Sequence, residues 1–370
     1  MKKQRICIIG DGLSGLTSAL ALKNLQNIEL DLILNDTKKF GDSRTTAISE
    51  SNFKFLKTII KNFDSKLFWP SKNIQLFFET SNKQFNFLNF EEGEKKLMYV
   101  CENKKFKSLL LREIKLKKIK TFKKKVNNLN VLKNYDLIIL CLGTKSPLYN
   151  KVTNGRTISK DYKELALTGQ IQTNLKFMKA GQYFLKDGPL AILPFSKNKF
   201  SFVWTISKDL FQSKSKNIKN FTERKIKDIL KINENIKIKH LKSYPIKLNL
   251  ETKYFNDNLL VLGDGLHRVH PVAGQGFNLV LRDIKQLKEI INYYSVLGIQ
   301  FDTSQILNEF TKNRKPENIL LSLGIDVTRS FFKKNNYLDP VKKIFLKNLN
   351  RIPYLKKISL KISDTGLNFN

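Results

Sequence analysis

A glycine-rich segment in the second half of the chain carries the densest group of residues suited to chemistry. It runs GDGLHRVHPVAGQGFNLVLRD from Gly263 to Asp283, with two of the three histidines, four glycines and a proline before a helical pattern begins. Glycine lets a main chain approach another group without obstruction by a side chain. The segment therefore indicates either an elaborate turn or a backbone that lies close against a flat, charged ligand.

A G-x-G-x-x-G motif lies near the N-terminus, between the apolar run Ile6–Ile9 and the helical pattern Leu16–Leu25. In a βαβ unit the first glycine permits a tight turn, the second lets a phosphate approach, and the third lets helix and strand pack closely. The N–H groups and positive dipole end of the helix suit a pyrophosphate. The residues expected at this corner are Gly10, Gly12, Leu13, Ser14 and Gly15.

A ribose-binding acid is expected about 20 residues after such a motif. The predicted strand Leu30–Leu34 ends just before Asp36, which is the candidate. An exposed turn carboxylate is the alternative interpretation of Asp36.

The spacing of His267 and His270, i and i+3, could suit a metal pair. No further cluster of ligand residues accompanies them, and we predict no metal site. A structural role in the turn is expected for both, and a proton-transfer role for His270 stays open.

The order of elements predicts an α/β domain that is split by a β-rich insertion and followed by helices. Helical patterns cover Thr46–Phe63, Lys104–Lys118, Phe221–Ile232, Gly274–Tyr294, Thr303–Phe332 with an interruption near Pro316, and Pro340–Leu349. Extended patterns cover Asn73–Phe78, Gln84–Leu88, Asp136–Cys141, runs between Glu164 and Ile206, Lys239–Ile246 and Leu259–Leu262.

The 67 Lys and Arg residues outnumber the 32 Asp and Glu residues, which gives a net charge of +35. Such a charge favours anionic partners, such as nucleic acid or an acidic membrane face. The abundance of Lys, Asn, Ile and Phe together would also follow from a biased nucleotide composition. No RNA-binding signature accompanies the basic run 104–126, and we predict no nucleic-acid partner.

Three widely spaced cysteines, Cys7, Cys101 and Cys141, predict reduced, buried thiols and a cytosolic setting. The apolar run at the N-terminus is too short for a signal peptide. No apolar stretch reaches the length needed to span a bilayer, so a soluble or peripheral protein is expected.

Five segments together resemble the FAD-dependent aromatic hydroxylases (class A flavoprotein monooxygenases), and among them the ubiquinone-biosynthesis hydroxylases, which are 2-polyprenyl-6-methoxyphenol hydroxylase-like. In order they are IIGDGLSGLTSALAL, GDSRTTAIS, YVCENKKF, GPLAILPF with FSFVWTI, and LVLGDGLHRVHPVAGQGFNLVLRD. The second fits the family pattern D-x-R-x-x-A-x-S at Asp42, Arg44, Ala47 and Ser49. The likeness extends from Ile6 to about Phe332.

The resemblance implies a Rossmann-like FAD-binding domain of the p-hydroxybenzoate-hydroxylase type, a β-rich substrate domain and a helical C-terminus. We assign residues 1–60, 97–150 and 250–300 to the discontinuous FAD-binding domain. Residues 61–96 and 151–249 form the expected substrate domain, and residues 301–370 the C-terminal helices.

By resemblance, Gly263 and Asp264 meet the ribityl chain of the flavin, whose hydroxyls donate to Asp264. Pro271 is expected beside the isoalloxazine face with His270 in the same turn, and Arg44 is expected to contact the flavin or its phosphates. The residues that open the next helix, where N–H groups can reach the flavin N1–C2=O edge, are Gly274, Gln275, Gly276, Phe277 and Asn278. A helix N-terminus stabilises the negative charge of a reduced flavin at N1.

The implied reaction begins with reduced FAD and oxygen, forms a C4a-hydroperoxide and delivers OH to an electron-rich phenol ring. The cofactor carries this chemistry, and no catalytic triad is needed. The implied substrate is a polyprenyl phenol, with Leu193, Pro194 and Phe195 at its pocket. NAD(P)H or a reductase would supply electrons.

The chain departs from the family at Leu142, where an Asp linked to flavin and nicotinamide handling is expected; Gly143 and Ser146 are kept. Glu164 also stands where related proteins often carry Gln. Leu142 leaves open the alternative of a catalytically impaired FAD-binding accessory or scaffold protein of the quinone pathway. A flavin-dependent isoprenoid reductase, which shares the fold, is a second alternative.

The C-terminal run from Asp339 to Ser363 mixes apolar and basic residues. Val341, Ile344, Phe345 and Leu349 can share one face of a helix that ends before Pro353. The residues flanking or opposite that face are Lys342, Lys343, Lys347 and Arg351. This pattern favours a helix lying on an anionic membrane surface, and a packed helix with solvated lysines is the alternative. We predict a cytoplasmic protein, peripheral on the inner face of the membrane, with a quinone-biosynthesis protein complex as a further partner.

Overall fold

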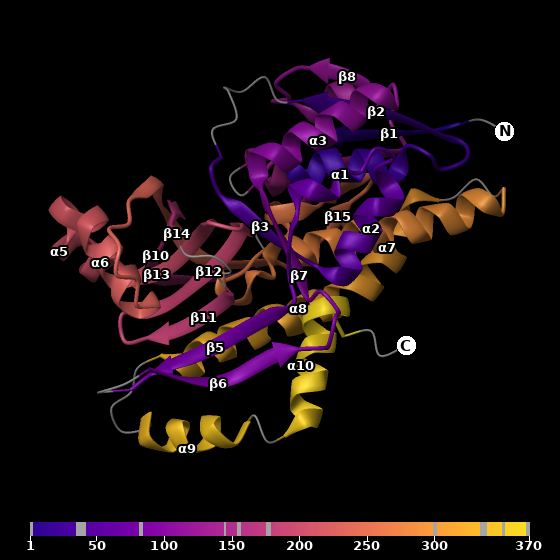
Figure 1. The fold of residues 1–370 in the computed structure, drawn as a ribbon. Helices are drawn as coiled ribbons and strands as arrows, with labels where there is room; N and C mark the ends of the chain where they lie inside the picture. The colour runs from indigo at the N-terminus through magenta and orange to yellow at the C-terminus, as the bar shows by residue number, and fades with distance from the viewer. Residues whose placement is uncertain are drawn as a thin grey trace.

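The computed structural model of the chain contains three sheets and a set of helices at the C-terminus (Figure 1). It describes residues 3–34, 42–80, 84–143, 146–153, 157–174, 179–298, 302–333, 339–349 and 352–367. Asp36 and Arg351 lie outside these residues.

A six-stranded sheet holds both predicted glycine corners. Its order is β15 (Phe255–Asn256), β16 (Leu259–Val261), β9 (Leu137–Leu140), β1 (Gln4–Ile9), β2 (Ile28–Leu34) and β8 (Lys120–Lys123). All neighbours are parallel except the β15–β16 pair. The strands β1 and β9 are almost wholly buried, as expected for parallel strands covered on both faces. Helices α1 (Leu13–Leu22), α3 (Asn103–Leu116) and α7 (Gly276–Val296) pack together beside this sheet.

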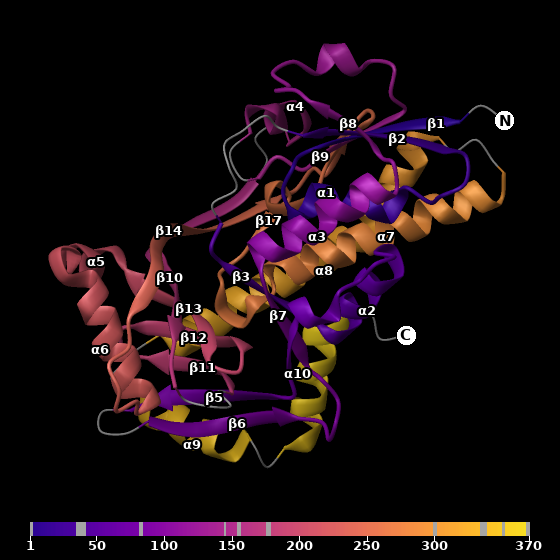
Figure 2. The same cartoon turned by 45° about the horizontal axis from the view of Figure 1, so that its top comes forward.

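An eight-stranded sheet forms the second part of the molecule (Figure 2). Its order is β17 (His267–Arg268), β14 (Ile238–Glu251), β10 (Thr157–Gln172), β13 (Lys199–Ser207), β12 (Gly188–Ser196), β11 (Ala180–Leu185), β5 (Asn73–Glu79) and β6 (Gln84–Glu91). Helices α5 (Lys208–Ser213) and α6 (Ile218–Leu230) cover one end, over a core that includes Phe200, Phe202 and Trp204.

A three-stranded sheet joins the two larger sheets, and one of its strands lies where a helix was predicted. Its strands are β3 (Thr45–Ser49), β7 (Met98–Glu102) and β4 (Trp69–Ser71). The predicted helix Thr46–Phe63 is wrong at its start, because β3 pairs with β7 before α2 (Glu50–Ile59) begins. Strand pairing across the fold overrides the local helical pattern there.

The C-terminal region is helical, as predicted. It comprises α8 (Thr303–Phe332), α9 (Asp339–Leu349) and α10 (Pro353–Thr365). The predicted interruption near Pro316 is wrong, because α8 continues through the proline. Its neighbours Arg314, Glu317 and Asn318 are buried and hydrogen-bonded, which holds the turn. Pro353 begins α10, a position where proline loses no helical hydrogen bond.

The remaining helical turns are short. They are α4 (Asn150–Thr153), η1 (Ser65–Leu67), η2 (Leu129–Leu132), η3 (Pro147–Tyr149), η4 (Ser215–Asn217), η5 (Gly263–Gly265) and η6 (Val272–Gly274). Within the described ranges, no helix is long and apolar enough to cross a membrane.

The three cysteines are buried free thiols, which confirms that part of the prediction. Burial raises the pKa of Cys7, Cys101 and Cys141 to about 12 in each case. These thiols are therefore protonated at neutral pH and suited to packing rather than to reaction.

Candidate functional site

The corner between β1 and α1 has the local geometry that its glycines predict. Gly10 has a φ of +144°, and a Cβ there would overlap the carbonyl oxygen of Cys141. A Cβ on Gly15 would overlap the carbonyl oxygen of Gly10, so helix and strand touch at this point. A Cβ on Gly12 would meet no heavy atom within 4 Å. Two glycines therefore serve packing, and the third leaves space in front of the helix N-terminus.

The second glycine corner lies directly against the first. Gly263 has a φ of +86°, and a Cβ there would stand 2.9 Å from Ser14 Oγ. The side chain of Asp264 is exposed beside it. Two segments about 250 residues apart in sequence thus meet where the resemblance places the two ends of one dinucleotide.

One cavity of about 840 Å³ connects these corners to the large sheet. This volume lies within the usual range for ligand and cofactor sites. The predicted residues that line it are Gly12, Leu13, Ser14, Arg44, Leu193, Asp264, His270, Pro271, Gly274, Gln275, Gly276, Phe277 and Asn278. Gly10, Gly15 and Gly263 do not line the cavity themselves but pack behind its wall. Of the three predicted substrate-pocket residues, Leu193 lines the cavity, whereas Pro194 and Phe195 are not among its described lining residues.

Helix α7 begins at this cavity, and Asn278 fixes its position. The Asn278 side chain donates to the carbonyl of Ala47 (3.2 Å) and accepts from the N–H of Ser49 (3.0 Å). The amide of Asn52 donates to the Asn278 side-chain oxygen at 3.0 Å. The side chain of Asn278 therefore holds the helix start against β3 and α2, which leaves the first N–H groups of α7 as the donors that can face a ligand.

Arg44 is oriented by Asp42 at the cavity wall. Its Nε and Nη2 donate to the two carboxylate oxygens of Asp42 at 2.8 and 2.7 Å. Asn103 donates to the same carboxylate at 3.0 Å. Burial alone would raise the pKa of Asp42, but the hydrogen bonds and charge of Arg44 hold it below its usual value. Asn103, within the family-like segment YVCENKKF, is a site residue that the sequence analysis did not single out.

His270 occupies a buried turn between Glu164 and Val272. Its Nδ1 accepts from the N–H of Val272 (3.2 Å), so Nε2 carries the proton and donates to Glu164 Oε2 (3.2 Å). Burial lowers the pKa of His270, although Glu164 opposes this shift. Both nitrogens are committed, and the geometry favours a structural role over proton transfer.

Arg329 of α8 forms an ion pair with Glu164, which stands where related proteins often carry Gln. It donates from Nε to Glu164 Oε2 at 3.1 Å, and its Nη2 pairs with Glu164 Oε1. Burial favours the neutral acid, but the bonds to His270 and Arg329 keep the pKa of Glu164 below its usual value. The sequence analysis noted Glu164 as unusual for the family. It could not identify Arg329 as the partner, because no local pattern links the two residues.

His267 belongs to a separate buried network. Its Nε2 lies 2.6 Å from Asp283 Oδ2, and the other carboxylate oxygen accepts from Arg314 Nε at 2.7 Å. Asn318 donates to the same oxygen at 3.0 Å. The network joins α7 to α8, and His267 itself lines the cavity. Among the described residues, no group of three or more His, Cys, Asp or Glu side chains is arranged to hold a metal ion.

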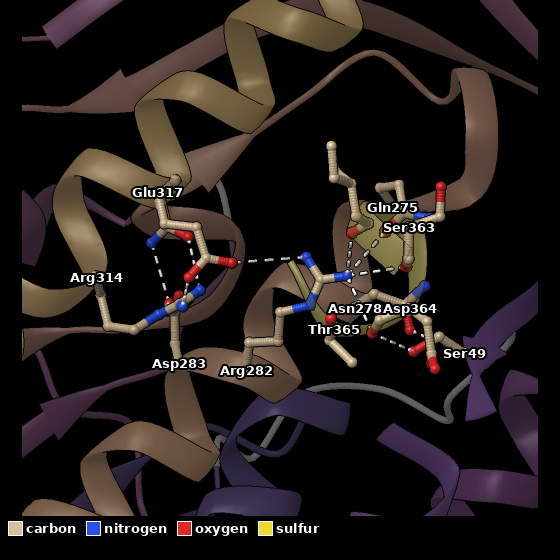
Figure 3. Close-up of polar contacts among 12 residues, drawn as sticks. Ser49, Gln275, Asn278, Arg282, Asp283, Arg314, Glu317, Ser363, Asp364 and Thr365 are labelled. Carbon is tan, nitrogen blue, oxygen red and sulfur yellow. Dashed lines mark hydrogen bonds and ion pairs between the residues drawn. The ribbon is translucent and has the colours of Figure 1, made fainter. Parts of the chain in front are cut away.

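The C-terminal helix forms part of the cavity wall and is tied to α7 (Figure 3). Arg282 Nη2 donates to the carbonyls of Ile362 (3.5 Å), Ser363 (2.9 Å) and Asp364 (3.4 Å). The same nitrogen lies 3.4 Å from Gln275 Oε1. Burial lowers the pKa of Arg282 to about 10, so it stays charged at neutral pH. No sequence pattern signalled this contact.

Leu142 follows β9 at the cavity edge. Its N–H donates to the phenolic oxygen of Tyr149 at 2.8 Å, and its partly buried side chain packs against the main core. The position is therefore occupied by an apolar side chain that contributes to packing and offers no carboxylate.

Comparisons with known proteins agree with this arrangement. Residues 138–295 match a family model described as an FAD binding domain. Ubiquinone hydroxylase UbiL of Rhodospirillum rubrum is 30% identical over 189 residues, which is 49% of this chain and 43% of that protein. The 3-demethoxyubiquinol 3-hydroxylase of Escherichia coli is 26% identical over 49% of this chain and 46% of that protein. The matched region thus spans less than half the length of these relatives.

Solved structures show the same fold over nearly the whole chain. The p-nitrophenol 4-monooxygenase PnpA of Pseudomonas putida has a TM-score of 0.76 at 11% identity, covering 98% of this chain and 97% of that one. The probable FAD-dependent monooxygenase pqsL of Pseudomonas aeruginosa has a TM-score of 0.71 at 13% identity, covering 90% and 97%.

The fold and the matched domain define a flavoprotein with the architecture of FAD-dependent monooxygenases, whose cofactor is FAD. Its relatives confirm the resemblance to the FAD-dependent hydroxylases of ubiquinone biosynthesis. The individual FAD-contacting residues stay proposals, with Asp36 outside the described part of the chain.

Proposed function

We propose that this protein is an FAD-dependent monooxygenase that hydroxylates the aromatic ring of a polyprenyl phenol in ubiquinone biosynthesis. When bound, FAD supplies the oxygen-activating redox chemistry. The similarity to a ubiquinone hydroxylase and a 3-demethoxyubiquinol 3-hydroxylase supports a phenolic or quinone substrate, and the cavity supports a site in which flavin and substrate lie together.

The residues of the chain would bind and orient the cofactor and the substrate, and would exclude water from the site. Gly12, Leu13 and Ser14 would receive the pyrophosphate at the N-terminus of α1, and Asp264 would accept from the ribityl hydroxyls. The first N–H groups of α7 would face the negative edge of the ring, where the helix dipole favours charge. The wall that includes Leu193 and Val203 would cover the opposite side with apolar surface.

The single observation that carries the proposal is the junction of Gly263 with Ser14 at one cavity. This junction places the helix that suits a diphosphate beside the turn and helix that suit a flavin ring. A flavin held there would face the apolar wall of the large sheet, where a phenol ring can pack.

Purified protein tests the proposal through its colour, oxygen use and product. We expect a flavin absorption band, oxygen consumption with NAD(P)H or a reductase, and a phenol product heavier by one oxygen-18 atom under labelled oxygen. Bound FAD without turnover would instead support the accessory or scaffold role that Leu142 suggests. A product that gains two hydrogens would support an isoprenoid reductase.

We place this activity in the cytoplasm, at the inner face of an anionic membrane and within a protein complex of the quinone pathway. The excess of basic residues supports contact with the anionic membrane. Fractionation of cells into cytosol, membrane and high-molecular-mass complex tests the assignment, and recovery of all the protein as a free monomer in cytosol would contradict it.

A further inference from the structure

The exposed apolar side chains of this protein are concentrated at one place. Ten of the 16 exposed large apolar residues in the described ranges lie between Leu320 and Leu355, in α8, α9 and the start of α10. Scattered single residues of this kind are normal on a soluble protein, but a contiguous group marks an interaction surface.

The apolar residues of α8 form one stripe. Leu320, Leu323, Val327 and Phe331 follow each other at intervals of three and four, and 59%, 41%, 67% and 37% of these side chains are exposed. Such spacing places all four on the same side of the helix. The opposite side of the helix contains the buried residues Asn318 and Ser322.

Helix α9 extends this stripe. The rings of Phe331 and Phe345 lie 6.1 Å apart in an edge-to-face contact, which joins the two helices at their exposed sides. Val341, Ile344 and Phe345 are 64%, 65% and 52% exposed. Three of the four residues predicted to share one face are thus exposed together. The fourth, Leu349, packs with Leu346 against the core on the other side of the helix.

The charge around the stripe is strongly positive. Residues 320–361 contain ten Lys and Arg against two Asp, which gives 10 − 2 = +8, and one of the ten, Arg329, is paired with Glu164 outside this range. Both acids are paired, Asp326 with Lys160 and Asp339 with Lys342. Lys343 and Lys347 are exposed on α9, whereas the predicted flanking residue Lys342 is buried.

The same helices reach the cavity. Thr328 and Phe332 of α8 and Lys357, Leu360 and Lys361 of α10 belong to its lining. Thr328 directly follows Val327 of the stripe, and Phe332 directly follows Phe331. The exposed apolar residues of α8 therefore border residues that line the cavity.

We infer that the exposed sides of α8, α9 and the start of α10 form a docking face for an anionic lipid bilayer, from which a lipophilic substrate enters the cavity. The apolar stripe would lie in the interface, with the surrounding lysines at the lipid headgroups. This arrangement identifies the face and the entry route for the proposed function, on which the substrate part of the inference rests.

The test compares wild-type protein with two sets of triple serine variants. The docking variant carries Val341→Ser, Ile344→Ser and Phe345→Ser. The matched control carries Tyr293→Ser, Val296→Ser and Leu297→Ser at the end of α7, where the side chains are 63%, 60% and 52% exposed. Figures 1 and 2 place that end away from α9. Each FAD-loaded protein is floated with vesicles of phosphatidylcholine containing about one third phosphatidylglycerol.

We expect wild type and the control to float with these vesicles, and the docking variant to bind at least about tenfold more weakly. Replacing Lys343 or Lys347 by Gln should weaken binding about fivefold for each lysine at low salt. Equal binding by the docking variant, or no binding by wild type, would overturn the inference. So would a wild-type dimer, detected by light scattering, that the docking variant dissociates.

Oxygen insertion into a short-chain, water-soluble phenol separates the two proposals. None of the substituted residues lines the cavity, so the docking variant should keep this activity. Vesicle binding without any oxygen insertion would reject the proposed function and leave the docking face intact. Activity on the soluble phenol without vesicle binding would support the proposed function and reject the docking face.

Discussion

Arg282 Nη2 lies 2.9 Å from the carbonyl oxygen of Ser363, and this contact ties the first turns of α7 to the last turn of the chain's final helix. The guanidinium reaches three successive carbonyls at the C-terminus of α10 (Figure 3). A cation is favourable there, because the last carbonyls of a helix lack partners within the helix and carry partial negative charge. The helix that begins at the cavity thus also holds one of its walls.

Replacing Arg282 by Met should release α10 and destabilise the protein by about 3 kcal/mol, because the carbonyls and the nearby Glu317 would lose their buried cation. Urea unfolding measures the free energy, and limited proteolysis detects release of the last helix. Lys285→Met, on the exposed side of α7, is the matched control and should change neither. Gly366→Ala should also release α10, because its φ is +86° and a Cβ would overlap Glu317. Unchanged proteolysis in both site variants would contradict the assignment.

The three glycines of the N-terminal motif should respond differently to alanine. Gly12→Ala should fold normally, because its φ is −78° and no heavy atom lies within 4 Å of the added Cβ. It should nevertheless weaken FAD binding by about tenfold or more if a phosphate occupies that space. Gly15→Ala should not fold, because the Cβ meets the backbone of Gly10. Thermal unfolding and FAD titration distinguish these effects.

Gly324→Ala provides the control for the glycine series. It also has no heavy atom near the added Cβ, and it lies in α8, away from the motif. It should stabilise the helix by about 0.5–1 kcal/mol and leave FAD affinity unchanged. Equal FAD affinity in Gly12→Ala and wild type would show that the pyrophosphate does not lie at this corner.

The sequence predicted features that depend on neighbouring residues. The strands β1, β2 and β9 and the two glycine corners each have a local pattern, because buried parallel strands are short apolar runs and a tight turn needs a residue without a Cβ. The contacts that complete the site join residues far apart in the chain. Glu164 and Arg329 are 165 residues apart, and Arg282 and Ser363 are 81 apart.

The errors have the same physical origin. Thr46–Ser49 continues a helical pattern locally, but pairing with Met98–Cys101 makes it a strand. Pro316 should interrupt α8 by its own chemistry, but the buried bonds of Arg314 to Asp283 and Asn318 hold the helix through it. In both places tertiary contacts outweigh a preference of a few kcal/mol at most.

The apolar residue at position 142 should limit reduction of the flavin by nicotinamide. We expect Leu142→Asp to speed flavin reduction by NAD(P)H, since the resemblance places a carboxylate there. Stopped-flow absorbance under anaerobic conditions measures this rate. Leu142→Asn has nearly the same shape without the charge and is the matched control. No gain in Leu142→Asp over Leu142→Asn would remove the charge at this position as the cause.

The buried turn at His270 should make stability depend on pH. Burial lowers the pKa of His270 from its usual 6.5. As pH falls below that value, the unfolded chain takes up a proton that the folded chain refuses, so the free energy of unfolding decreases. His270→Gln lacks this proton and should show a smaller decrease between about pH 7 and pH 5 in urea titrations.

The groups around His270 set the lower end of this pH range. Glu164 favours the protonated form of the imidazole, Arg329 opposes it, and Asp326 adds a weaker attraction. Glu164 has a lowered pKa as well, so its contribution is present above 4.5 and is lost at lower pH, outside the range of the histidine test. His240→Asn, at an exposed strand position, is the control for loss of a histidine outside the buried turn. An unchanged slope in His270→Gln would mean that His270 is as easily protonated in the folded protein as in the unfolded chain, which its two committed ring nitrogens argue against.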